Sequence, residues 1–164
     1  MTRLATLFAL VLAACGAGAP GGPMSGKLND PGPVSAQSSV VSTEILGREP
    51  VANVAIVKHI LISWKDLEDS FQGHQDQRAQ ARTKAQAEAE VKSLLGQIKA
   101  GGDFEALMKE KSEDVGSARS NAPFTVTPDA QLVIEFRQLS LRLNVGEIGV
   151  CQSDFGFHII KRYQ

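Results

Sequence analysis

The chain has 164 residues, of which 43% are hydrophobic and 21% are charged, and its formal net charge is -1. These values are typical of a globular protein and exclude collagen-like, coiled-coil-only and multi-span membrane proteins. The near balance of 17 basic and 18 acidic residues excludes the basic surface of nucleic-acid-binding proteins. Cys15 and Cys151 are too few for a disulfide framework of the small secreted kind.

A short apolar run opens the chain. Residues 4–14 (LATLFALVLAA) follow Arg3 and are too short to cross a bilayer, which takes about 20 apolar residues. Their length and position match a secretory signal peptide. The run ends in Leu12-Ala13-Ala14-Cys15, which resembles the lipobox of bacterial lipoproteins. The resemblance implies removal of residues 1–14 as a signal peptide and acylation of Cys15, which would anchor the chain in a lipid bilayer of the cell envelope.

The residue after the cysteine is Gly16. In Gram-negative lipoproteins an aspartate at this place resembles an inner-membrane retention mark, so its absence favours the outer membrane, facing the periplasm. The alternative is a soluble secreted protein in which Cys15 follows the apolar run by chance.

Residues 15–52 are rich in Gly, Pro and Ser and show no sustained apolar period. Gly and Ser make a chain flexible and Pro keeps it extended, so this segment is predicted to be a tether. The alternatives are a pro-segment or an ordered wrap whose apolar side chains cover a groove on the domain. These side chains are Val40, Val41, Ile45, Leu46 and Val51.

A compact domain is predicted over 53–164. The β-branched run 54–63 (VAIVKHILIS) predicts a buried strand, and the polar residues 64–77 predict a loop. Residues 78–100 are rich in good helix formers and predict a helix, which Gly101-Gly102 ends. Its apolar stripe consists of Ala87, Val91, Leu94, Leu95 and Ile98.

Asp103 is the predicted N-cap of a second helix, which places Phe104, Leu107 and Met108 on its inner face. Residues 124–126 predict a short strand. Thr127-Pro128 predicts the start of a third helix. Its apolar positions are Leu132, Phe136, Leu139 and Leu143. Residues 148–152 and 157–163 predict two strands joined by a hairpin.

The predicted order is β-α-α-β-α-β-β. Terminal strands that flank the helices and meet in one sheet make an α+β domain. The first and last of these strands carry His59 and His158, which can therefore be neighbours.

Common catalytic and cofactor motifs are absent from the sequence, including Gly-rich phosphate loops, His-Glu-x-x-His and Cys-x-x-Cys. No third and fourth ligand joins His59 and His158, so no metal and no cofactor are predicted. Cys151 could pair with a histidine as a nucleophile, but nothing indicates a lowered pKa for its thiol. It is predicted to be a small buried apolar residue.

Four fragments in order resemble the parvulin-type peptidyl-prolyl cis/trans isomerases. They are Val57–Ile62 with its histidine, the helix pair containing GDFEAL at 102–107, SEDVGSA at 112–118, and FGFHII at 155–160. The resemblance covers nearly all of 56–163. It implies a small antiparallel sheet of about four strands with about three helices packed around it.

The resemblance also implies an activity and a site. The activity is rotation of X–Pro bonds, without a cofactor, in unfolded or X–Pro-containing exported proteins. The family's catalytic positions fall on His59, Asp114, Ser153 and His158. A one-residue shift would place Val115 at the acidic position. The pocket for the proline ring falls on Phe124, Leu132 and Phe136, with Phe155 at its edge.

The sequence departs from the family pattern in two places. Residues 119–124 replace the usual G-G-D-L-G-W-F stretch, and Val133 stands where a glutamine commonly lines the pocket. These departures leave open an alternative function, a catalytically weak chaperone or adaptor lipoprotein that binds clients. The oligomeric state has no signal in the sequence.

The loop after the first strand bears on substrate choice. Phosphate-directed parvulins place basic residues there, because cations bind phosphate strongly. Here Lys65 stands against Asp66, Glu68, Asp69 and Asp76. A preference for phosphorylated serine before proline is therefore not expected.

Overall fold

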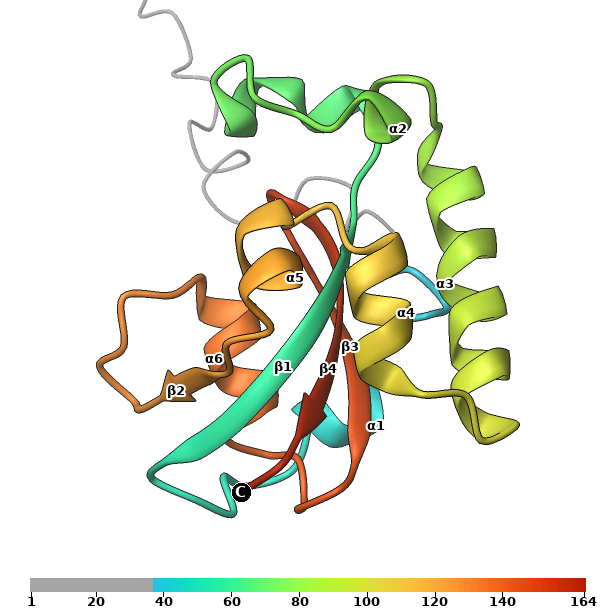
Figure 1. Ribbon diagram of the computed structural model, residues 1–164. Coiled ribbons are helices and arrows are strands. Elements are labelled where there is room, and N and C mark those ends of the chain that lie inside the picture. The colour runs from blue at the N-terminus through green and yellow to red at the C-terminus, as the bar shows by residue number, and fades with distance from the viewer. Residues whose placement is uncertain (1–36) are drawn as a thin grey trace, which may run out of the picture. The chain divides into compact units, whose positions relative to one another are not determined.

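The computed structural model of the chain describes residues 37–164. Four strands in this range form one antiparallel sheet. They are β1 (Ala55–Ile62), β2 (Phe124–Val126), β3 (Ile148–Ser153) and β4 (Gly156–Arg162). Their order across the sheet is β2-β1-β4-β3, so the first and last strands are its two central members (Figure 1). The predicted α+β fold is confirmed. The predicted signal peptide 1–14 and lipidation site Cys15 lie outside the described residues.

Helices pack around this sheet. Those of residues 37–164 are α1 (Thr43–Leu46), η1, a 3-10 helix (Lys65–Phe71), α2 (Gln77–Gln80), α3 (Lys84–Lys99), α4 (Phe104–Lys111), α5 (Val115–Ser120) and α6 (Ile134–Ser140). Helices α3, α4 and α6 stand where helices were predicted. The short elements α1, η1, α2 and α5 were not predicted.

Two hydrophobic clusters lie on opposite faces of the sheet, because successive strand residues point to opposite sides. Ile60 and Phe157 belong to the cluster packed against α3 and α4. Val57 and Ile160 belong to the cluster packed against α6. Helices α3 and α4 therefore cover one face and α6 covers the other (Figure 1).

Local hydrogen bonding explains two helix boundaries that differ from prediction. Helix α3 begins only at Lys84, because Thr83 and Gln86 form a reciprocal capping box in which each side chain accepts from the other's backbone N–H. Thr127 precedes a turn at residues 128–129 and not a helix, and the Ala130 N–H donates to the Thr127 carbonyl at 3.1 Å. Helix α6 accordingly begins later than predicted, at Ile134.

The domain begins before residue 53, its predicted boundary. Val40, Val41 and Ile45 are buried, whereas Val51 is 52% exposed. The Ser42 N–H donates to the Val150 carbonyl at 2.8 Å, and the Ser42 hydroxyl accepts from the Val150 N–H at 2.9 Å. Residues 38–48, here called the N-terminal strap, thus cover the outer edge of β3 and are part of the compact unit 37–164, not of a free tether. Apolar burial and these two bonds outweigh the Gly/Pro/Ser bias of the wider segment.

Gly156 allows the hairpin to end close to β1. Its φ is +133°, and a Cβ at this position would lie 2.5 Å from the Ile62 carbonyl oxygen. Glycine adopts this backbone without steric cost. The close approach fixes the register that places His158 beside β1.

Within residues 37–164, no helix has both the length and the apolar character that crossing a membrane requires.

Candidate functional site

Two buried histidines lie on the face of the sheet covered by α6. His59 and His158 are 4% and 5% exposed, and His158 pairs across the strands with Leu61, two residues from His59. Side chains on one face of adjacent strands are within reach of each other. The two Nδ1 atoms are 3.2 Å apart, and the stacked rings have centroids 5.3 Å apart.

Asp114 and Ser153 extend this pair into a line of hydrogen bonds. Asp114 Oδ2 lies 2.9 Å from His59 Nε2, and Ser153 Oγ lies 2.8 Å from His158 Nε2. The Phe155 N–H donates to Ser153 Oγ at 3.1 Å. The structure thus brings together the four residues that the resemblance assigned to catalysis, and it places Asp114, not Val115, against His59.

One arrangement of protons on two neutral rings satisfies the whole line. A carboxylate only accepts, so His59 Nε2 donates to Asp114 and His59 Nδ1 is left as an acceptor. His158 Nδ1 must then donate to it, and His158 Nε2 accepts from the Ser153 hydroxyl. These tautomers follow from the hydrogen-bond geometry. Every donor in the line points towards the Asp114 carboxylate.

Burial and hydrogen bonding shift the pKa values of the line. Complete burial, helped by the nearby His59, lowers the pKa of His158 from 6.5 to about 3. The hydrogen bond with His59 holds the pKa of the Asp114 carboxyl well below its ordinary value, although partial burial opposes this. At neutral pH the site therefore holds an uncharged His158 imidazole and an ionised Asp114.

Asp114 also begins helix α5. Its Oδ1 accepts from the Ser117 N–H at 3.3 Å, while the Ser117 hydroxyl lies 3.4 Å from His59 Nε2. One carboxylate thus caps α5 and orients His59. The spacing Asp114-x-x-Ser117 is an N-cap pattern, and it is the signal by which the sequence could have predicted α5.

A pocket of about 450 Å³ opens in front of the histidines. The predicted site residues that line it are His59, Asp114, Phe124, Leu132, Phe136, Phe155 and His158. Ser153 is not among the lining residues, since its hydroxyl is bound to His158. The other lining residues are Leu61, Phe71, His74, Glu113, Val115, Gln131 and Val133. Phe71 and His74 come from a segment predicted only as a polar loop, and Gln131 supplies a glutamine two residues before Val133.

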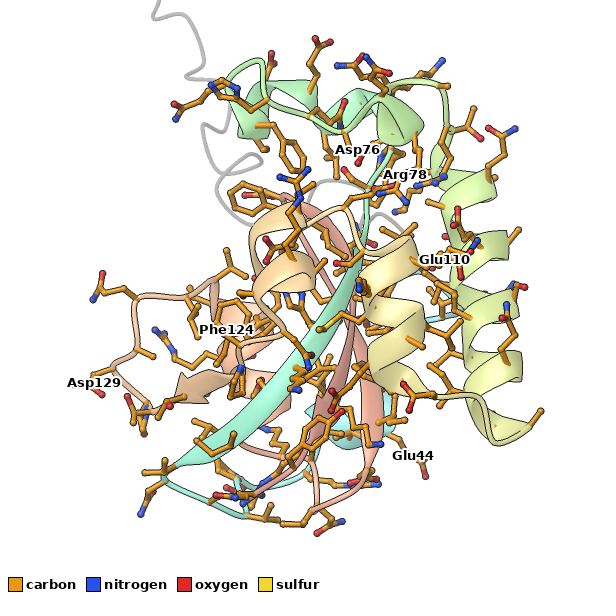
Figure 2. All side chains as sticks on the ribbon, viewed as in Figure 1. Glu44, Asp76, Arg78, Glu110, Phe124 and Asp129 are labelled. Carbon is orange, nitrogen blue, oxygen red and sulfur yellow. The ribbon has the colours of Figure 1, made fainter. Side chains whose placement is uncertain are left out.

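Aromatic rings form the inner wall of the pocket. The ring of His59 meets Phe124 and Phe136 edge-on, with centroids 5.3 and 5.1 Å apart. Phe124 and Phe136 also contact each other, with centroids 5.6 Å apart. Figure 2 shows Phe124 beside α6, on the opposite side of β1 from α4. Phe71 and Phe155 pack edge-on at 5.4 Å and also line the pocket.

The chemistry of these groups points to binding without covalent catalysis. Cys151 pairs with His158 across β3 and β4, but burial raises the pKa of its thiol, so it is not a thiolate nucleophile. Its predicted burial is confirmed. Among residues 37–164, no three His, Cys, Asp or Glu side chains are grouped to hold a metal ion. The pocket offers an apolar surface backed by fixed hydrogen bonds.

Comparisons with known proteins identify the family and agree with this fold. The sequence family described as "PPIC-type PPIASE domain" matches residues 43–163. Foldase protein PrsA of Geobacillus kaustophilus is 27% identical over 122 residues, which cover 74% of this chain and 43% of that protein. Periplasmic chaperone PpiD of Escherichia coli is 38% identical over 74 residues, which cover 45% of this chain and 12% of that protein. The chain thus spans less than half the length of these curated relatives.

A solved structure shows the same fold. Peptidyl-prolyl isomerase ESS1 from Candida albicans superposes with a TM-score of 0.57 at 19% identity, over 68% of this chain and 63% of that one.

Proposed function

The chain belongs to the parvulin, or PPIC-type, family of peptidyl-prolyl isomerases, and on that premise we propose that it catalyses cis/trans isomerisation of X–Pro bonds in exported proteins. The observation that carries the proposal is the apolar pocket that opens on the buried His59–His158 pair. Two similar proteins bear the names foldase and periplasmic chaperone, which supports a role in folding within the cell envelope.

The reaction requires a changed environment and no covalent step. Rotation about the peptide bond faces a barrier of about 18–20 kcal/mol that arises from amide resonance, and X–Pro rotation is slow enough to limit folding. Water stabilises the charge-separated, planar form of the imide. A pocket lined by Leu132, Phe124 and Phe136 excludes that water. The free energy of the twisted state then falls relative to that of the planar state, which lowers the barrier to rotation.

The site residues take distinct roles in this proposal. Phe124, Leu132 and Phe136 hold the proline ring, and Phe155 closes the edge of the pocket. His59 and His158 form its polar floor. Ser153 is a positioning residue, because it contacts His158 and not the cavity. Asp114 both lines the pocket and orients His59.

Substrates without phosphate fit this pocket best. None of its lining residues is lysine or arginine, and phosphate recognition uses such cations. The segment η1 carries Asp66, Glu68 and Asp69 against Lys65. The proposed isomerase is therefore not directed to phosphoserine–proline.

A refolding assay tests the isomerase function. The full chain at micromolar concentration should accelerate the proline-limited refolding of a substrate protein. Replacing Phe136 by leucine should lower kcat/KM about tenfold, which corresponds to one lost aromatic contact. Phe104→Leu is the matched control, because both phenylalanines are 3% exposed and Phe104 packs on the other face of the sheet.

Absence of any acceleration would refute the isomerase function. The alternative function, a weak chaperone or adaptor, would then be the remaining proposal. The replacement of the family's Gly-rich stretch by residues 119–124 favours this alternative, which predicts that the full chain binds an unfolded client without changing the client's refolding rate. An equal loss of activity in the Phe136→Leu and Phe104→Leu variants would refute the assignment of the pocket.

Lipid anchoring belongs to the same proposal. Residues 1–14 act as the signal peptide and Cys15 carries the lipid, which holds the domain at the periplasmic face of a membrane, the outer one in a Gram-negative cell. More than one acyl chain is needed for stable attachment. Cells producing the chain should incorporate labelled palmitate into it, and Cys15→Ser should abolish the label. A chain that takes up no label, or a variant that keeps it, would refute the anchor.

A further inference from the structure

Building on the proposed isomerase function, we propose that the pocket selects X–Pro segments in which a lysine or arginine flanks the proline. Two chain segments that are distant in the sequence meet at the cavity. Phe71 closes η1 and Phe155 lies at the tip of the β3–β4 hairpin. Their rings pack edge-on, and both line the cavity.

Exposed carboxylates are close neighbours of this aromatic pair in the sequence. Asp69 lies two residues before Phe71, and Asp154 directly precedes Phe155; both side chains are exposed. Asp66 and Glu68 add two more exposed carboxylates on η1. Within residues 37–164, none of these four carboxylates takes part in an ion pair.

Cations near the cavity do not offset these charges. Arg82 is bound to Glu113 at 2.6 Å, so that pair is neutral overall. Arg78 is likewise bound to Asp76 at 2.9 Å. Arg119 lines a separate hollow between α4 and α5.

Two further cations keep their charge. Arg137, on α6, donates to the neutral Ala130 carbonyl at 2.9 Å, but it belongs to neither the η1 segment nor the β3–β4 hairpin. Lys65 is the single cation of η1, where it stands beside three carboxylates. The η1 segment and the hairpin turn, which carry Phe71 and Phe155, thus hold four exposed carboxylates against one lysine.

This combination suits a long cationic side chain. The methylene stem of lysine or arginine packs on aromatic rings while its charged end stays in water near the carboxylates. A glutamate or phosphoserine in the same place meets only like charge. Exposed charge pairs are individually weak, so a preference of about fivefold for a basic over a neutral neighbour is expected from several carboxylates together. Salt should reduce it, because the charges are exposed.

A peptide panel measures the preference. Peptides that differ only in the residue before or after proline (Lys, Arg, Ala or Glu) are offered to the full chain, and both the isomerisation rate and the dissociation constant are measured at low and high salt. The expected order is Lys and Arg above Ala above Glu at low salt, with the differences shrinking at high salt. Replacing Asp69 and Asp154 together by asparagine should bring the Lys-to-Ala ratio close to one. Glu44→Gln removes one exposed charge on α1, well away from Phe124 and the pocket (Figure 2), and should leave the ratio unchanged.

The outcomes separate the two proposals. Isomerisation of all peptides with no charge order, or with Glu preferred, overturns the charge preference and leaves the isomerase function standing. Binding in the expected order without isomerisation supports the charge preference and refutes catalysis. Neither binding nor isomerisation of any peptide overturns both. If the Lys-to-Ala ratio is unchanged in the variant that carries both Asp69→Asn and Asp154→Asn, the assignment to these carboxylates is overturned.

Discussion

Replacing His158 by glutamine should remove a pH dependence that the buried imidazole imposes on folding. Burial lowers the pKa of folded His158 to about 3, against 6.5 for an ordinary histidine. Between these values the unfolded chain binds a proton that the folded chain does not bind. The free energy of unfolding therefore falls as the pH falls. The contribution of neutral His158 is complete above pH 6.5 and declines progressively below it.

The magnitude follows from one proton. Each pH unit in this window lowers the free energy of unfolding by about 1.4 kcal/mol, so the step from pH 6.5 to pH 4 removes about 3 kcal/mol. The two carboxyl groups that line the pocket add further effects. The lowered pKa of Asp114 weakens the fold only below 3.8, and the raised pKa of buried Glu113 favours the fold as the pH falls towards 4.5. Both groups remain in the variant, so the difference between the two proteins isolates His158.

Urea unfolding at pH 4, 5, 6 and 7 provides the assay, followed by the fluorescence of Trp64, which is the single tryptophan and is buried. The wild-type chain should lose about 3 kcal/mol over this range, while His158→Gln should lose much less. His74→Gln is the matched control, because His74 is exposed, and it should behave as the wild type. A His158→Gln variant that loses stability as steeply as the wild type would refute the reasoning.

Three further predictions test the packing by the same urea assay at pH 7. Gly156→Ala should cost about 3 kcal/mol or more, because its Cβ would lie 2.5 Å from the Ile62 carbonyl oxygen at a positive φ; a loss below about 1 kcal/mol would contradict the hairpin geometry. Leu94→Ala should lower the free energy of unfolding by about 3 kcal/mol, since Leu94 is 1% exposed, and Leu95→Ala by about 1 kcal/mol, since Leu95 is only partly buried. Equal losses in the two variants would contradict the orientation of α3. Ser42→Ala should cost about 1 kcal/mol and speed hydrogen exchange at the Val150 amide, whereas the exposed Thr43→Ala should change neither.

Long, periodic segments were predictable from the sequence. The run in β1 predicts a buried strand, and the apolar stripe of α3 predicts a helix with a defined inner face; both are observed. The histidines of β1 and β4 were predictable as neighbours because the order of the elements brings the first and last strands together. Their link to Asp114 came from family resemblance, since residue patterns alone gave no reason to choose that carboxylate.

Apolar periodicity does not predict short elements or loop contacts. Helix α5 has six residues, too few for an apolar period, so the spacing of Asp114 and Ser117 at its cap is the signal that the sequence offers for it. The predicted helix start at Thr127 was wrong, because a turn at residues 128–129 follows it and α6 begins only at Ile134. Phe71 joins the pocket through Phe155, more than eighty residues away in the sequence. Such contacts are decided by tertiary packing, so local preferences carry no information about them.

The N-terminal strap determines how the domain responds to tension. A pull on the chain ahead of Ser38 reaches the two Ser42–Val150 hydrogen bonds before it reaches the sheet. Hydrogen bonds that are pulled apart from one end break one after another. The hydrogen bonds of a strand pair that is loaded parallel to the strands share the load. Under load the strap would detach from β3 while the pairing of β1 with β4 stayed intact. Detachment of the strap would lengthen the connection to the sheet and leave the histidine pocket in place.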